Sequence, residues 1–232
     1  IGAVSPFSFW DMGYKFHFPP SQMQSPLWEL YNSVAFRFGF FRDIFSEYFY
    51  KKSIKTMLSQ KPLKQKMLSG GHIMVRKSIL VEIGGLFDEG FFMYYEDTDL
   101  CLRITRHGYS LMLVPEAKVV HFWANESSKY SFQDISKEYF LKKHFNFLAA
   151  YGFIKRVVEK FKLNEPDGYT NFGDVHEMPK FSMYTDSSMP CVIELGFHYT
   201  FIPAIISFLK VNEKPDFDSI YPYLRDGEHW LR

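Results

Sequence analysis

The feature that most constrains the fold is a run of large apolar side chains followed directly by carboxylates. It lies in the segment GGLFDEGFFMYYEDTDLCLRITRHGY, residues 84–109. Residues 91–95 are Phe, Phe, Met, Tyr and Tyr, and Glu96, Asp97 and Asp99 come next. Carboxylates in this position either cap a helix at the edge of a core or act as functional groups in a cleft. The segment therefore predicts a buried loop that leads into a helix.

We expect this helix to begin at Asp97 or Thr98, because either side chain can act as an N-cap. His107 and Gly108 should end it, since glycine readily takes the left-handed conformation found after helices. Its apolar residues recur at helical spacing and would face a core on one side: Leu100, Cys101 and Ile104.

Shorter elements are expected before it. Gly70 and Gly71 predict a tight turn, residues 72–75 a strand, and residues 78–83 a short helix that stops at Gly84.

Prolines divide the other apolar segments. The first nine residues, IGAVSPFSF, predict a buried strand that runs into a turn at Pro6. Residues 110–123, SLMLVPEAKVVHFW, predict two short strands around Pro115.

Longer stretches predict helices and loops. Residues 27–49 indicate a helix that is interrupted near Gly39, and residues 132–161 have helical spacing throughout. Residues 51–66 contain six lysines and no acid, which fits a solvated loop or helix face, or contact with anionic lipid or phosphate groups. Residues 164–190 are rich in turn-forming residues and predict a linker.

Composition excludes several classes of protein. The net charge of +1 in 232 residues argues against a nucleic-acid partner. The two cysteines, Cys101 and Cys191, form no metal or disulfide pattern, so a cytoplasmic setting is expected. No apolar run reaches the length of about 18 residues that suggests a membrane span. The first residue is Ile1, so we expect a natural protein that extends further upstream.

The block from Gly70 to His121 resembles the second half of the catalytic domain of family 2 glycosyltransferases, which have the GT-A fold. Three stretches carry the resemblance, in the family's order: SGGHIMVRKSIL, EIGGLFDEGFFMYYEDTDLCLRITRHGY and LVPEAKVVHFW. The resemblance implies an α/β fold with a partial GT-A-like (Rossmann-like) mixed sheet and flanking helices. We expect this acceptor-side half in residues 1–125, a helical segment packed on it in residues 126–163, and a helical or irregular extension in residues 164–232.

The resemblance also implies a reaction. The carboxylate at Asp97 would act as general base in an inverting transfer of a sugar from a nucleotide-sugar donor to a saccharide or lipid-linked acceptor. A sugar hydroxyl is a poor nucleophile at neutral pH, so it needs a base within hydrogen-bond reach. Residues expected to contact the acceptor are Glu96, Asp99, Tyr94, Tyr95, Gly70, Gly71 and Arg103. Without the resemblance, Asp97 could be a helix cap, and Asp99 and Arg103 could form a structural ion pair.

His121 ends an apolar strand. Such a histidine is often a core or edge residue, but in metal-dependent relatives a histidine at this place joins the ligands of a divalent ion, Mn²⁺ or Mg²⁺. His176 and Glu177 have no further ligand at useful spacing and are interpreted as loop residues.

The segment before Gly70 departs from the family because it contains no Asp-x-Asp motif. The donor-binding half would therefore lie outside this sequence, upstream or on another chain. The alternative is a non-catalytic saccharide- or protein-binding module derived from a transferase. Lipid-linked acceptors in relatives would place the protein at the inner face of a membrane as a peripheral protein, and oligomer formation is a further way to complete the site.

Overall fold

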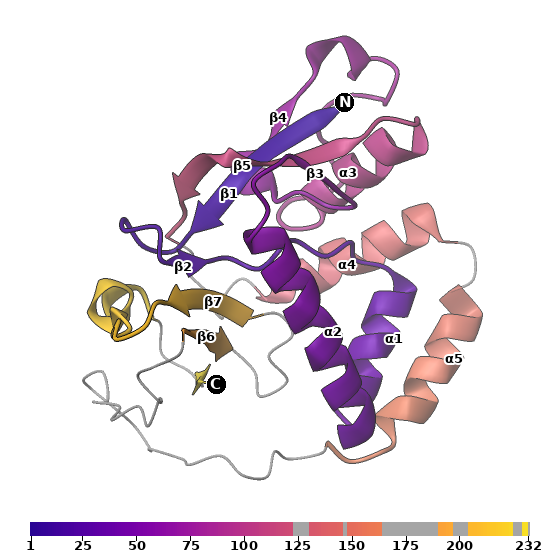
Figure 1. Cartoon of the computed structure of the whole chain (residues 1–232). Helices are drawn as coiled ribbons and strands as arrows, with labels where there is room; N and C mark the ends of the chain where they lie inside the picture. The colour runs from indigo at the N-terminus through magenta and orange to yellow at the C-terminus, as the bar shows by residue number, and fades with distance from the viewer. Residues whose placement is uncertain (123–129, 146–147, 164–189, 197–203, 225–228, 232) are drawn as a thin grey trace.

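The computed structural model describes residues 1–122, 130–145, 148–163, 190–196, 204–224 and 229–231. They form a curled mixed sheet with helices packed beside it (Figure 1). Its strand order is β3-β5-β1-β2-β7-β6-β8, and β4 pairs with β1 off this path. The strands are β1 (Ala3–Phe9), β2 (Phe16–His17), β3 (Leu63–Gln65), β4 (Met74–Val75), β5 (Leu111–Val120), β6 (Cys191–Gly196), β7 (Ala204–Leu209) and β8 (Trp230–Leu231). The α/β fold with a mixed sheet is confirmed.

Strands β1 and β5 pair in parallel, and both run through their prolines. The register shifts beside Pro6, where Pro6 lies opposite Val114 but Phe7 lies opposite Lys118. An irregularity of this kind accommodates Pro115, which has no backbone N–H to donate to a partner strand. The predicted turn at Pro6 and the predicted division of the second segment into two strands are therefore wrong.

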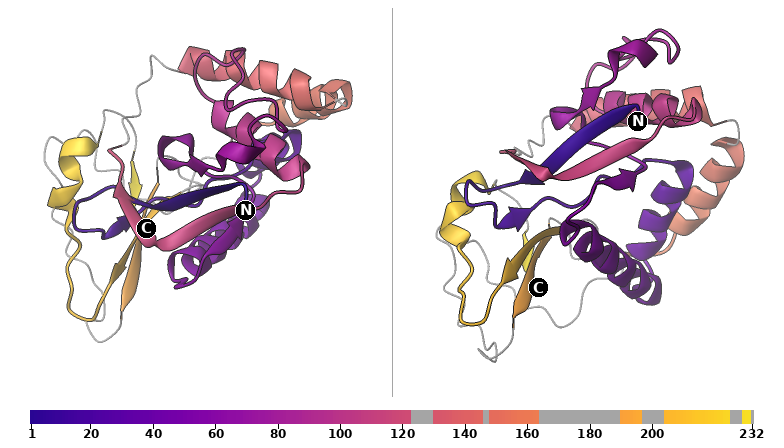
Figure 2. Two further views of the ribbon diagram at one scale, coloured as in Figure 1. Left: turned by 90° about the horizontal axis from the view of Figure 1, so that it is seen from above. Right: turned by 45° about the horizontal axis from the view of Figure 1, so that its top comes forward.

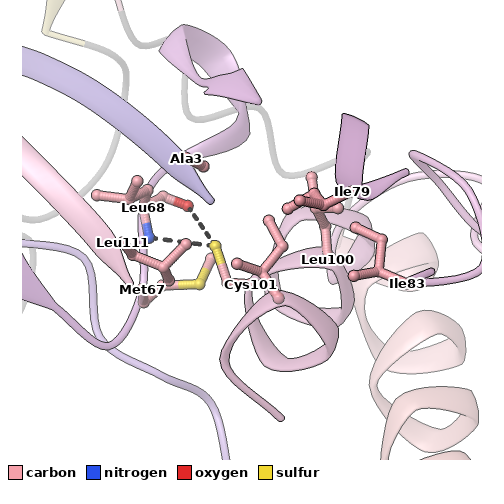
Figure 3. Packing of buried hydrophobic residues seen from close by; sticks show 9 residues of the cluster. Ala3, Met67, Leu68, Ile79, Ile83, Leu100, Cys101 and Leu111 are labelled. Atoms are coloured by element: carbon pink, nitrogen blue, oxygen red, sulfur yellow. Dashed lines mark hydrogen bonds between the residues drawn. The ribbon is translucent and has the colours of Figure 1, made fainter. Parts of the chain in front are cut away.

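Helix α3 (Glu96–Arg106) packs behind this strand pair. Its inner side carries Leu100, Cys101 and Ile104, all 0% exposed, as the spacing predicts. The thiol of Cys101 approaches the backbone of Leu68, and burial raises its pKa to about 12 (Figure 3). The cluster comprises Ala3, Met67, Leu68, Ile79, Ile83, Leu100, Cys101, Ile104 and Leu111. This core fixes where the start of α3 lies.

The remaining helices flank the sheet, and α1 packs against both α2 and α5 (Figures 1 and 2). Ser25 caps α1 by accepting a 3.1 Å hydrogen bond from the Trp28 amide. The predicted interruption near Gly39 is confirmed, since α2 begins there, whereas the predicted helix over 132–161 is two helices. The lysine-rich segment contributes the end of α2 and then β3. The bounds of the remaining helices are α1 (Pro26–Ala35), α2 (Gly39–Met57), α4 (Tyr130–His144) and α5 (Leu148–Glu159).

The described part of the C-terminal extension contains strands, where we expected helical or irregular structure. Strand β7 pairs with β2, so the extension joins the same sheet as the N-terminal segment. A second core lies at this junction: Trp10, Phe16, Ile193, Leu195, Ile205, Leu209, Phe217 and Ile220. Residues 164–189, which include His176 and Glu177, lie outside the described residues.

Candidate functional site

The chain enters α3 through two consecutive left-handed residues. Tyr94 has φ 67° and Tyr95 has φ 65°, and Tyr95 is the N-cap residue, without a side-chain capping bond. The prediction that Asp97 or Thr98 caps the helix is therefore wrong. Non-glycine residues in this conformation cost about 1–3 kcal/mol each and cluster at functional sites. Buried packing offsets the cost, because the Tyr95 ring lies 5.4 Å from that of Phe140.

Asp97 lies in the first turn of α3, half-buried, with backbone amides as its partners. Its Oδ2 accepts a 2.9 Å hydrogen bond from the Gly70 amide, and its Oδ1 accepts a 2.7 Å bond from the Thr98 amide. Burial raises the pKa of Asp97 even though these hydrogen bonds act in the opposite direction. A raised pKa makes the carboxylate a better proton acceptor, which suits a general base.

The two glycines let the neighbouring turn approach this site closely. A Cβ on Gly70 would lie 2.8 Å from the Cβ of Asp97, and a Cβ on Gly71 would lie 3.4 Å from Cε1 of His121. Because Gly70 has no side chain, its amide can come close enough to donate to the Asp97 carboxylate. Contact of either glycine with a substrate stays a prediction.

His72 and His121 meet at the other end of this turn. Nε2 of His72 lies 3.0 Å from Nδ1 of His121, and the rings cross nearly at right angles. Burial, and next the neighbouring His72, lower the pKa of His121. Neutral imidazole nitrogens are good metal ligands. Within the described residues, however, no group of three or more His, Cys, Asp or Glu side chains could hold a metal, so further ligands would have to come from elsewhere.

Asp99 lies on the opposite side of α3 and is 0% exposed. It accepts three hydrogen bonds of 2.7 Å, from Nε of Arg103, Nζ of Lys143 and Nε2 of His144. Burial acts to raise the pKa of Asp99, but the bonds from Lys143, His144 and Arg103 outweigh it and hold the pKa below its usual value. The structural ion pair of Asp99 with Arg103 that we considered is present, and the bonds from Lys143 and His144 tie α4 to α3.

Arg103 extends this network to the loop before α3. Its guanidinium donates to the carbonyl oxygens of Ile83, Gly85 and Leu86 at 2.7–2.8 Å. Gly84 and Gly85 have φ of 80° and 97°, so the predicted left-handed stop at Gly84 is confirmed. All three nitrogens of the Arg103 guanidinium therefore donate to groups of the protein itself. Contact of Asp99 or Arg103 with a substrate stays a prediction.

Glu96 and Tyr94 adjoin Asp97. Oε2 of Glu96 is buried and has no hydrogen-bond partner among the described residues. Burial raises the pKa of Glu96, and the charge of Asp97 adds to this. The Tyr94 side chain packs against the cluster of Phe91, Tyr95, Phe140 and Leu141. Glu96 is therefore a carboxyl group with free hydrogen-bonding capacity beside the proposed base.

A cavity of about 530 Å³ lies beside the turn that holds Asp97. Ser69 and His72, which flank the two glycines, line it together with His121 and Tyr95. Sequence reasoning missed the residues on the α1 and α4 side, because they come from segments far apart in the chain. They include Gln22, Gln24, Trp28, Glu29, Asn32, Gln133, Asp134 and Lys137. Amides, carboxylates and an aromatic ring are the groups that bind hydroxyl-rich ligands.

Curated proteins similar to this chain are sugar transferases. The rhamnosyltransferase WbbL of Escherichia coli (strain K12) is 38% identical over 81 residues, which are 35% of this chain and 30% of that protein. The chain resembles rhamnosyltransferases. An N-acetylglucosaminyl-diphospho-decaprenol L-rhamnosyltransferase of Mycobacterium tuberculosis is 42% identical over 62 residues, 27% of this chain and 20% of the relative.

A third such relative is the dTDP-rhamnosyl transferase RfbF of Shigella flexneri, 33% identical over 79 residues, 34% of this chain and 26% of the relative. The matches thus span a third or less of these rhamnosyltransferases. No family model and no solved structure matches. The resemblance to glycosyltransferases is confirmed. Among the described helices, none combines the length and apolar character needed to cross a membrane.

Proposed function

We propose that this chain is the acceptor-side part of an inverting glycosyltransferase that transfers a deoxyhexose. The observation that carries the proposal is Asp97, a half-buried carboxylate with a raised pKa in a chain similar to rhamnosyltransferases. Asp97 itself does not line the cavity, but it binds the turn whose residues Ser69 and His72 do. A carboxylate held by two amides keeps its orientation and still has lone pairs available for a substrate proton.

In the proposed reaction, the acceptor hydroxyl oxygen attacks the anomeric carbon of the donor sugar. Its proton passes to a carboxylate oxygen of Asp97 while the new bond forms. The bond between the anomeric carbon and the diphosphate oxygen breaks, and the diphosphate leaves with that electron pair. Attack from the opposite face inverts the configuration. The amides of Gly70 and Thr98 hold Asp97 in place, and the aromatic residues before it keep out water that would hydrolyse the donor.

The relatives suggest the substrates. One acts on dTDP-rhamnose and another on an N-acetylglucosaminyl diphospho-lipid, as their names state. We propose dTDP-rhamnose as donor and a diphospholipid-linked saccharide as acceptor, in polysaccharide biosynthesis. The acceptor sugar would occupy the cavity, near Tyr95. The donor-binding half would lie outside this sequence.

The proposal includes a divalent ion, Mn²⁺ or Mg²⁺, with His121 as one ligand and His72 beside it. Bound there, the ion would neutralise charge on the leaving diphosphate.

The test is Asp97→Asn in the protein at its natural length. We expect rhamnosyl transfer from dTDP-rhamnose to fall about 10²–10⁴-fold, the usual contribution of a general base, with a melting temperature no lower than that of the wild type. Asp43→Asn is the matched control, because Asp43 is 70% exposed and pairs with its neighbour Arg42. Transfer by Asp97→Asn within a few fold of the wild type would remove Asp97 from this role.

A second candidate is a non-catalytic binding module. The observation that favours it is the lack of an Asp-x-Asp motif in residues 1–69. Calorimetric titration of the protein at its natural length with dTDP and Mn²⁺ separates the two, because nucleotide affinity that depends on manganese would count against the module.

A further inference from the structure

Exposed aromatic side chains gather where the end of α1, the start of α2 and the residues after α5 come together (Figures 1 and 2). The ring of Phe38 lies 5.1 Å from that of Phe161 and 6.4 Å from that of Phe41. Nε of Arg37 also donates a 3.0 Å hydrogen bond to the Phe161 carbonyl. These contacts join α2 to the segment after α5. We define the aromatic tip as Tyr31, Phe38, Phe40, Phe41, Phe45 and Phe161.

Helix α2 exposes large apolar side chains, which a surface helix usually buries. Phe40 is 71% exposed, Phe41 43% and Ile44 45%, and Tyr48 follows on the same side one turn later. The buried residues of α2 are mostly small and polar: Ser46, Ser53, Thr56 and Met57. A helix that only packs on its own protein buries its apolar side. The outer side of α2 therefore has the composition of a contact surface.

Positive charge surrounds the aromatic tip. Residues 36–44 and 153–163 contain six basic residues and two acidic ones, and both acids already pair, Asp43 with Arg42 and Glu159 with Lys155. No carboxylate among the described residues lies within ion-pair distance of Arg156, Lys160 or Lys162, which are exposed. The basic residues are Arg37, Arg42, Lys155, Arg156, Lys160 and Lys162.

We propose that the aromatic tip docks this chain onto an anionic lipid bilayer. Aromatic rings are favoured at the boundary between water and hydrocarbon, and lysine and arginine near the surface are attracted to anionic headgroups. Charge also argues against a second copy as the occupant, because two tips facing each other would bring like charges together. The proposal is independent of the proposed reaction.

Flotation with vesicles tests it, using the 232-residue chain and no enzyme assay. We expect binding to vesicles of phosphatidylglycerol with phosphatidylcholine, weaker binding to phosphatidylcholine alone, and release by salt. The double variant Phe40→Ser, Phe41→Ser should lower the partition coefficient at least about tenfold, because two exposed rings lose their burial in lipid. Lys160→Glu with Lys162→Glu should remove the preference for anionic vesicles.

Phe92→Ser is the matched control, since Phe92 is 79% exposed but lies outside the tip. It should bind vesicles like the wild type. Melting temperatures establish that each variant is folded, and Phe40→Ser alone replaces the double variant if that one unfolds. Vesicle binding that survives both pairs of substitutions would overturn the proposal. So would a dimer in analytical ultracentrifugation that Phe40→Ser dissociates in a chain that does not bind vesicles.

Discussion

Asp97 and Asp99 are two residues apart on α3, yet different groups surround their carboxylates on the two sides of the helix. Toward the Gly70 turn, uncharged donors hold Asp97, two backbone amides and the Thr98 hydroxyl, and burial raises its pKa. Toward α4, three basic side chains surround Asp99, and its pKa lies below the usual value. Amides orient a carboxylate and leave it able to take a proton, whereas cations keep it charged. The same residue type therefore joins α3 to α4 on one side, and on the other it has the surroundings that the proposed general base requires.

The largest effect on stability should come from Asp99→Asn. The substitution leaves Arg103 without its buried counter-charge and Lys143 with Asp88 as its remaining carboxylate partner, so we expect the free energy of unfolding to fall by about 3–5 kcal/mol. Urea denaturation measures it. Asp43→Asn, at an exposed site, should stay within about 0.5 kcal/mol of the wild type. A loss below about 1 kcal/mol for Asp99→Asn would show that the α4 side is not the stabilising one.

A smaller effect is expected from Gly70→Ala on the other side of α3. The new methyl group would lie 2.8 Å from the Cβ of Asp97, so the turn and the carboxylate must move apart. We expect a loss of about 1–3 kcal/mol in the free energy of unfolding, as for other overpacked sites. Gly152→Ala in α5 meets no atom within 4 Å and should instead stabilise the protein by about 0.5–1 kcal/mol. Equal stability of the two variants would contradict the close packing at Gly70.

The smallest effect is a difference in pH dependence. Asp99 has a lowered pKa, so its stabilising contribution is present above the ordinary carboxyl pKa of 3.8 and is lost as the pH falls through and below it. Asp97 has a raised pKa, so its charged form destabilises the fold at neutral pH, and protonation relieves this as the pH falls. The two contributions oppose each other in the wild type.

In the Asp97→Asn variant, position 97 can no longer be protonated, so acid no longer removes a destabilising buried charge there. Its free energy of unfolding should therefore fall more steeply with acid than that of the wild type, between about pH 5 and 3. Denaturation series at several pH values measure both slopes. A shallower slope in the variant would mean that the pKa of Asp97 is not raised.

Local features of the fold could be predicted from the sequence. The inner side of α3 follows from the spacing of Leu100, Cys101 and Ile104, and the break before α2 and the left-handed turn at Gly84 follow from glycine chemistry. The start of α3 could not be predicted in this way, because Tyr95 takes a conformation that tyrosine rarely adopts and that tertiary packing supports.

Features that depend on distant segments were out of reach. Nothing near Asp99 in the sequence indicates that Lys143 and His144 will contact it, and nothing in the first seventy residues indicates that Trp28 and Asn32 line a cavity with His121. The register shift beside Pro6 likewise depends on the partner strand. Contacts of this kind arise from topology, which local patterns do not encode.

The pairing of β2 with β7 also governs how the chain reaches its folded state. His17 lies opposite Ile206, so β2 can pair with β7 only after most of this sequence has been synthesised. Sheets with such large sequence separation fold slowly, since a long loop must close before the contact forms. Until β7 arrives, β2 presents an open strand edge that other chains can join. We therefore expect the nascent chain to depend on chaperones more than its size alone would suggest.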